Sequence, residues 1–238
     1  MTHPSSSNFS PTQPLLRVPG IPAWKRTLDV ALIVLAAPVL LPVMFLIWLL
    51  IKCVSPGPAF FRQERIGYLG RSFTCFKFRT MIVNADTRIH QGHFNRLVDS
   101  NVPMKKLDSK GDPRLIPFGL LLRSLGLDEL PQIFNVLRGE MSLVGPRPCV
   151  PYEYENYTPR HRHRFEAVPG LTGLWQVSGK NQTTFEEMIN LDIYYARHKT
   201  LWLDLKIIFK TVPAIVSQTR EVGEKPRALL RNLSLDRR

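Results

Sequence analysis

The sequence predicts an α+β protein in which a mainly helical domain with one small β-hairpin follows a kinked, re-entrant membrane helix. Three observations lead to this prediction. A long apolar run lies near the N-terminus, a strand pattern surrounds a turn just after it, and apolar residues at helical spacing dominate the rest of the chain. The 238 residues contain no repeat and no central linker, so we expect one folded domain with appendages.

Four segments are expected along the chain. Residues 1–23 are rich in Ser, Pro and Thr and form a tail, 24–53 form the membrane helix, 54–220 form the main domain, and 221–238 form a basic C-terminal tail. The polar stretch 84–112 is weakly patterned, and we expect a loop there. The apolar run begins too late, and lacks the cleavage site, for a signal peptide, so it stays in the mature protein.

The composition narrows the partners and the compartment. A net charge of +13 attracts anions, whether nucleic acid, acidic lipid or phosphorylated substrates. The three cysteines, Cys53, Cys75 and Cys149, lack the close pairing of a zinc site or a disulfide framework. We therefore expect reduced thiols that face the cytosol.

The apolar run can cross a bilayer by length. Between Asp29 and Lys52 stand 22 apolar or Pro residues, which span roughly 33 Å as a helix. Pro38 and Pro42 each remove a backbone N–H inside the run, so the helix should kink near its middle. Basic residues flank both ends, and a simple crossing would put one basic flank on the disfavoured side. A re-entrant helix, which enters and returns, is favoured over a spanning one.

A hairpin follows the apolar run. Residues 59–63 and 71–79 read as strands around the turn 67–70. Lys77 and Arg79 share one face of the second strand. That face is either a solvated basic surface or a contact for an anionic substrate, and the pattern does not decide between the two.

An acidic pair stands at the start of a predicted amphipathic helix. The helix begins at or just after Asp128, with Pro131 in its first turn. Asp128 is then either an N-cap, with Glu129 as a partner of the helix dipole, or a nucleophile beside a carboxylate that holds a metal or moves a proton. Local sequence alone leaves both open.

Two further segments are suited to phosphate and nucleotide binding. Arg147 stands between two prolines, which presents its guanidinium from a stiff turn for bidentate phosphate binding. In the glycine-rich stretch 168–181 the glycines permit close backbone approach, and Trp175 could stack on a flat ligand. A surface turn and an ordinary glycine loop are the plain alternatives.

The C-terminal third contains a basic cluster and two predicted helices. The cluster 160–164 reads RHRHR, but no second pair of ligands at useful spacing supports a metal site. Residues 185–198 and 201–217 have helical patterns, and the second helix is either a core helix or one in the membrane interface. A membrane-tethered binder of anionic lipid or nucleic acid is a rival function, although the sequence has no recognisable nucleic-acid module.

Several motifs in order resemble one family. The strings KFRTM (77–81), SLGLDELPQ (124–132), GPRP (145–148) and PGLTGLWQVSG (169–179) are similar to those of the bacterial sugar transferase family, the monotopic phosphoglycosyl transferases. The resemblance extends from about Lys25 to about Val216. Larger members carry transmembrane helices before this module, and the chain resembles a minimal form without them.

The resemblance implies an enzyme that transfers a phosphosugar from a nucleotide diphosphosugar to polyprenyl (undecaprenyl) phosphate and releases UMP, with galactose or glucose favoured as the sugar. It implies Asp128 as the nucleophile, Mg²⁺ as the cofactor near Asp128 and Glu129, and Pro42 as the helix break. Implied phosphate contacts are Arg147, Arg123, Lys77 and Arg79, and the implied nucleotide-sugar loop includes Gly173, Trp175 and Gln176.

The resemblance also implies a place and partners. The catalytic domain would face the cytoplasm at the bacterial inner membrane, in contact with membrane lipid and not with nucleic acid, and a homodimer is left open. A metal-dependent phosphohydrolase on a membrane anchor, with water in place of the lipid acceptor, is the rival enzyme that uses the same carboxylates.

Overall fold

The computed structural model describes residues 20–83, 92, 102–103, 112 and 114–215. Most of the expected N-terminal tail, the 84–112 loop and the C-terminal tail lies outside these residues. The described chain is mixed helix and sheet, with two small two-stranded sheets and mostly short helices. The α+β class and the single hairpin expected from the sequence are confirmed.

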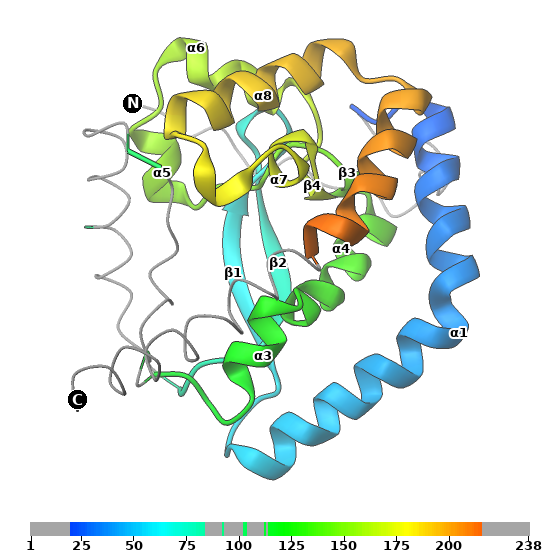
Figure 1. Ribbon diagram of the computed structural model, residues 1–238, viewed down its shortest axis with the longest axis vertical. Helices are drawn as coiled ribbons and strands as arrows, with labels where there is room; N and C mark the ends of the chain where they lie inside the picture. Colours follow the sequence, from blue (N-terminus) through cyan, green and yellow to red (C-terminus); the bar gives the residue numbers. More distant parts are fainter. Residues whose placement is uncertain (1–19, 84–91, 93–101, 104–111, 113, 216–238) are drawn as a thin grey trace, which may run out of the picture.

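The first element is the apolar helix α1, Ala23–Val54, which contains Pro38 and Pro42. Figure 1 shows that α1 bends sharply partway along, as the two missing N–H groups lead one to expect. By length and composition, α1 is the one helix among the described residues that could cross a membrane. Its outward face exposes a row of large apolar side chains: Val34, Leu35, Val39, Leu41, Phe45, Leu46 and Leu49.

The hairpin comes next. Strands β1, Phe60–Ile66, and β2, Ser72–Phe78, pair antiparallel from Phe60 opposite Phe78 to Ile66 opposite Ser72, and the 3-10 turn η1, Tyr68–Gly70, joins them. Gly70 has φ +77°, and a Cβ there would lie 2.6 Å from the Tyr154 hydroxyl. Only glycine therefore fits the end of this turn without a shift.

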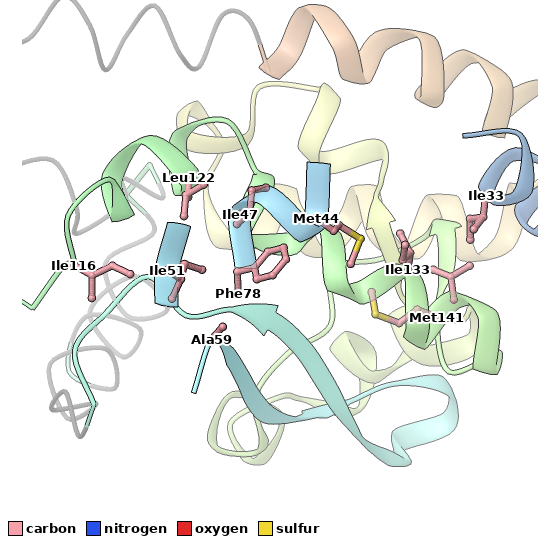
Figure 2. Close-up of a cluster of buried hydrophobic side chains, with 11 residues drawn as sticks. Ile33, Met44, Ile47, Ile51, Ala59, Phe78, Ile116, Leu122, Ile133 and Met141 are labelled. Carbon is pink, nitrogen blue, oxygen red and sulfur yellow. The ribbon is translucent and has the colours of Figure 1, made fainter. Parts of the chain in front are cut away.

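One hydrophobic core joins α1 to the rest of the domain. The inner side of α1 contributes Ile33, Met44, Ile47 and Ile51 to a cluster with Phe78 of β2. Figure 2 shows Ile47 and Ile51 near Phe78 and Ile33 at the other end of the cluster. The other partners come from α3, Gly119–Ser124, the 3-10 helix η3, Leu127–Gln132, and α4, Ile133–Arg138. One set of α1 side chains is thus apolar and exposed, as in a membrane helix, and another set belongs to the hydrophobic core.

A second layer follows α4. Strands β3, Ser142–Val144, and β4, Gly170–Thr172, pair in parallel, and α5, Pro151–Glu155, α6, Pro159–Arg162, and the 3-10 helix η4, His163–Glu166, lie between them in sequence. After β4 come α7, Leu174–Val177, η5, Lys180–Gln182, α8, Phe185–His198, and a helix over 201–215. The bounds of α8 match the sequence expectation, and Thr184 caps it through its side chain.

The start of α1 is tied to the last helix by buried polar groups. Lys25, 3% exposed, forms an ion pair with Asp204, 0% exposed, and donates to the Tyr195 hydroxyl at 2.9 Å. Tyr195 in turn donates to Asp204 Oδ1 at 2.7 Å. The upper arm of α1 and the helix 201–215 lie side by side for this reason (Figure 1).

The neighbouring residues of α1 bind backbone. Arg26 donates to the carbonyls of Val136 and Leu137 at the end of α4, and Asp29 accepts from the backbone N–H of Leu143 at 3.1 Å. Arg26, one of the basic residues that precede the apolar run, thus has its partners within the protein. Its side chain is buried because the last carbonyls of α4 need donors, which the guanidinium supplies.

Candidate active site

The acidic pair lies in the 3-10 helix η3. The N-cap is Gly126, with φ +70°, and Glu129 N–H donates to the Gly126 carbonyl at 3.2 Å. The helical stretch begins at Leu127, one residue before the expected start, and Asp128 lies inside it. The N-cap reading of Asp128 was wrong, because the left-handed Gly126 makes the turn directly after α3.

Lys77 of β2 forms an ion pair with Glu129 of the acidic pair. Its Nζ lies 2.6 Å from Oε1 of Glu129, with side chains 20% and 42% exposed. The basic face of β2 therefore packs toward η3. The structure therefore excludes a fully solvated basic face. It brings Lys77, a predicted phosphate contact, to Glu129, a predicted catalytic carboxylate.

Asn135 fixes η3 and α4 on the edge of β2. Its Oδ1 accepts the Phe76 backbone N–H at 3.1 Å, and its Nδ2 donates to the Thr74 carbonyl at 2.7 Å. The fully buried side-chain amide thus forms hydrogen bonds that a third strand would otherwise form along this edge. Sequence reasoning missed Asn135, although a polar residue on the buried side of an apolar helix was the available signal.

Arg147, another predicted phosphate contact, has charged neighbours that alter its pKa. Burial lowers the pKa of Arg147, but the Glu153 carboxylate and, more weakly, Glu129 raise it, and the pKa lies above its ordinary value. Burial lowers the pKa of Arg65, and the Arg147 cation lowers it further. A guanidinium group such as that of Arg147 can bind phosphate oxygens through paired hydrogen bonds.

Two other predicted phosphate contacts have partners in the protein. Arg79 is 5% exposed and donates to the carbonyls of Ser55 and Pro56 at 3.0 and 2.8 Å, just after the end of α1. Arg123 lies in the last turn of α3. The pKa of Asp112 falls to about 2, mainly through its hydrogen bond from Arg114, and Arg123 adds a smaller lowering effect.

The predicted nucleotide-sugar loop is tightly packed. Trp175 is 4% exposed, lies in a cluster with Phe185 and Met188, and donates its indole N–H to Thr183 at 2.6 Å. A Cβ on Gly173 would lie 2.2 Å from the Gly145 carbonyl oxygen. Gly173 therefore lets two segments of the protein backbone lie close together.

The RHRHR cluster divides between surface and core. His161 lies 2.9 Å from Glu186, and His163 lies 2.6 Å from Glu166. His163 is on the surface, whereas His161 is 7% exposed and Arg164, 1% exposed, forms a buried ion pair with Asp192. Within the described ranges, no group of three or more His, Cys, Asp or Glu side chains is arranged to hold a metal ion.

Comparisons with known proteins identify the family. The family described as bacterial sugar transferase matches residues 21–218. The exopolysaccharide production protein ExoY of Sinorhizobium fredii is 42% identical over 194 residues, which cover 80% of this chain and 84% of the relative. The UDP-glucose:undecaprenyl-phosphate glucose-1-phosphate transferase of Caulobacter vibrioides is 40% identical over 215 residues, 87% of this chain and 74% of the relative.

A longer relative shares the same region. The undecaprenyl-phosphate galactose phosphotransferase of Salmonella typhimurium is 38% identical over 192 residues, which cover 81% of this chain but 40% of the relative. Several of these relatives are named as transferases of sugar phosphates, in agreement with the clustered carboxylates and cations. With the family matched over nearly the whole described chain, this protein belongs to the bacterial sugar transferase family and is a sugar-phosphate transferase.

Proposed function

We propose that this transferase moves a hexose 1-phosphate from a UDP-hexose to undecaprenyl phosphate, as the first membrane step in the synthesis of an exopolysaccharide, capsule or lipopolysaccharide. One observation carries the proposal: Glu129, beside Asp128 in η3, is paired with Lys77 of β2 at 2.6 Å. Relatives named for undecaprenyl phosphate and for glucose or galactose support these substrates.

The chemistry would run in two displacements on one phosphorus atom. A carboxylate oxygen of Asp128 attacks the sugar-bearing phosphorus, the bond to the bridging oxygen breaks, and UMP leaves with that oxygen. A phosphate oxygen of undecaprenyl phosphate then attacks the same phosphorus and breaks its bond to Asp128. The products are UMP and undecaprenyl diphosphate sugar, and the carboxylate is regenerated. Arg147 and Lys77 would hold the diphosphate in line and offset its charge.

Magnesium fits this site only as an ion shared with the substrate. Asp128 and Glu129 supply two adjacent carboxylates, and the described residues provide no cluster of three metal-binding side chains. Mg²⁺ commonly takes one or two carboxylates and completes its shell with substrate phosphates and water. Bound in that way, it would neutralise charge on the diphosphate. Glu129 would then exchange its contact with Lys77 for the ion or for the acceptor phosphate.

We further propose that α1 is re-entrant, with the domain on the cytoplasmic face of the inner membrane. The bend of α1 and its exposed apolar row support insertion from one side (Figure 1). The helix 201–215 exposes Trp202, Phe209 and Val212 beside Lys206 and Lys210, which suits the head-group level of the same leaflet.

Purified protein in nanodiscs, supplied with Mg²⁺, UDP-glucose or UDP-galactose and undecaprenyl phosphate, tests the proposal by the rate of UMP release. Asp128→Asn should abolish release, and Glu129→Gln should reduce it severely. Glu155→Gln, which removes one exposed carboxylate elsewhere, is the matched control and should retain activity. UMP release that does not depend on undecaprenyl phosphate would instead identify a phosphohydrolase.

Isotope exchange tests the covalent step by itself. Without the lipid acceptor, an aspartyl-phosphosugar enzyme exchanges labelled UMP into UDP-hexose. Exchange that persists in Asp128→Asn would rule out Asp128 as the nucleophile. A cysteine-labelling experiment on either side of α1 tests topology, since labels that reach the two ends from opposite faces of the membrane would mean a span.

A further inference from the structure

The backbone that presents Arg147 is held at four consecutive carbonyl groups. The carbonyl of Pro146 accepts from Gly170 N–H at 2.9 Å, and that of Arg147 itself accepts from Arg164 Nη2 at 2.8 Å. The next two carbonyls accept from β1: Pro148 from Arg65 Nη1 at 3.1 Å, and Cys149 from Ile66 N–H at 2.8 Å. We call residues 146–149 the Arg147 turn.

Two of the four donors are buried arginine side chains with supports of their own. Arg164, 1% exposed, also donates to the Tyr157 hydroxyl at 2.8 Å and forms an ion pair with Asp192. Arg65, 9% exposed, also donates to Gln63 Oε1 at 2.6 Å. A guanidinium is planar and presents its donors in a fixed fork. The position of each arginine's second partner therefore determines where its other N–H group meets the turn.

The arrangement exceeds what a stable turn requires. Carbonyl groups in a loop are usually satisfied by water, whereas here two cations are desolvated to reach them. The prolines on either side of Arg147 already fix φ at their own positions, so the remaining freedom lies in the peptide planes that these hydrogen bonds hold. The two arginines therefore hold in place the backbone from which the Arg147 side chain extends.

We propose that Arg164 and Arg65 are positioning residues for the transfer reaction, which act through the Arg147 turn and do not touch the substrate. The proposal rests on the proposed role of Arg147 in binding the diphosphate of the sugar donor. It identifies a path from the second layer of the fold, at Asp192 of α8, to the Arg147 turn.

A double-mutant cycle tests the proposal through KM for UDP-hexose and kcat. Arg164→Lys retains the charge but loses the fork, and it should raise KM roughly tenfold with a smaller effect on kcat. In an Arg147→Ala background the same substitution should change KM less than about twofold, because the group that it positions is gone. Arg65→Lys should behave in the same way and serves if Arg164→Lys fails to fold.

Arg160→Lys is the matched control. Arg160 lies four residues before Arg164, is exposed, and pairs with Glu186 at 3.1 Å, so its effect should be small and independent of Arg147. Effects of Arg164→Lys and Arg65→Lys that are equally large with and without Arg147 would overturn the proposal. If Arg147→Ala alone leaves KM and kcat unchanged while UMP release persists, the positioning proposal fails and the transferase reaction stands.

Hydrogen exchange reports on the turn without any substrate. The amides of Ile66 and Gly170 donate to it, so both should exchange faster in Arg164→Lys and Arg65→Lys than in Arg160→Lys. Unchanged exchange at these two amides in both variants would overturn the proposal whatever the kinetics.

Discussion

Removing Asp204 should strongly destabilise the protein. Asp204→Ala leaves the ammonium of Lys25 buried without its carboxylate, at a position that is 3% exposed. Loss of one partner of a buried pair costs about 3–5 kcal/mol, and for a protein of this size each kcal/mol lowers Tm by roughly 2–4 °C. We therefore expect Tm to fall by roughly 6–20 °C. The hydroxyl of Tyr195, which also loses Asp204 as its acceptor, can still donate to the Val144 carbonyl at 3.1 Å, and this reduces the loss of stability.

The assay is thermal unfolding in detergent, followed by circular dichroism, with two comparison variants. Arg160→Ala removes the exposed partner of Glu186 and should cost less than about 1 kcal/mol. Lys25→Met combined with Asp204→Leu removes both charges and should restore most of the stability. The explanation fails if Asp204→Ala unfolds within about 2 °C of Arg160→Ala, or if the double variant is less stable than the single one.

Three further outcomes are expected. Trp175→Phe should lower the free energy of unfolding by about 1–2 kcal/mol, because the indole hydrogen bond and some buried volume are lost. Trp175→Ala should lower it by about 3–5 kcal/mol, and denaturant unfolding measures both. Maleimide at pH 8 should label the exposed Cys53 but spare the folded Cys149, since burial raises the pKa of the Cys149 thiol to about 12. Gly170→Ala should cost about 1–3 kcal/mol or prevent folding, because its Cβ would lie 2.0 Å from the Gly145 nitrogen; normal expression with an unchanged Tm would contradict this.

The elements that follow from local pattern were predictable. The hairpin was predicted from its alternation and its turn glycines, and the bounds of α8 from helical spacing. The bend of α1 follows from the missing N–H groups of Pro38 and Pro42. In each case the information lies within about 30 residues of sequence, which is the range over which a periodic pattern acts.

The long-range contacts were not predictable from such patterns. Lys25 and Arg26 stand in the basic flank of the apolar run, and their partners are a carboxylate and two carbonyls far along the chain. Trp175 read as a stacking surface, and its ring lies in the core. Arg164 read as one member of a basic surface cluster. Which cation is buried depends on the tertiary position of a carboxylate such as Asp192, and no local periodicity encodes that.

The tie between Lys25 and Asp204 also has a consequence for biosynthesis. The two residues are 179 positions apart, so the ribosome makes the apolar helix long before it makes the carboxylate. At about 5–20 residues per second, Lys25 waits roughly 9–36 s for its partner. During that interval the Lys25 ammonium lacks this carboxylate. The start of α1 can therefore form its ion pair with the helix 201–215 only late in synthesis, after Asp204 has been made.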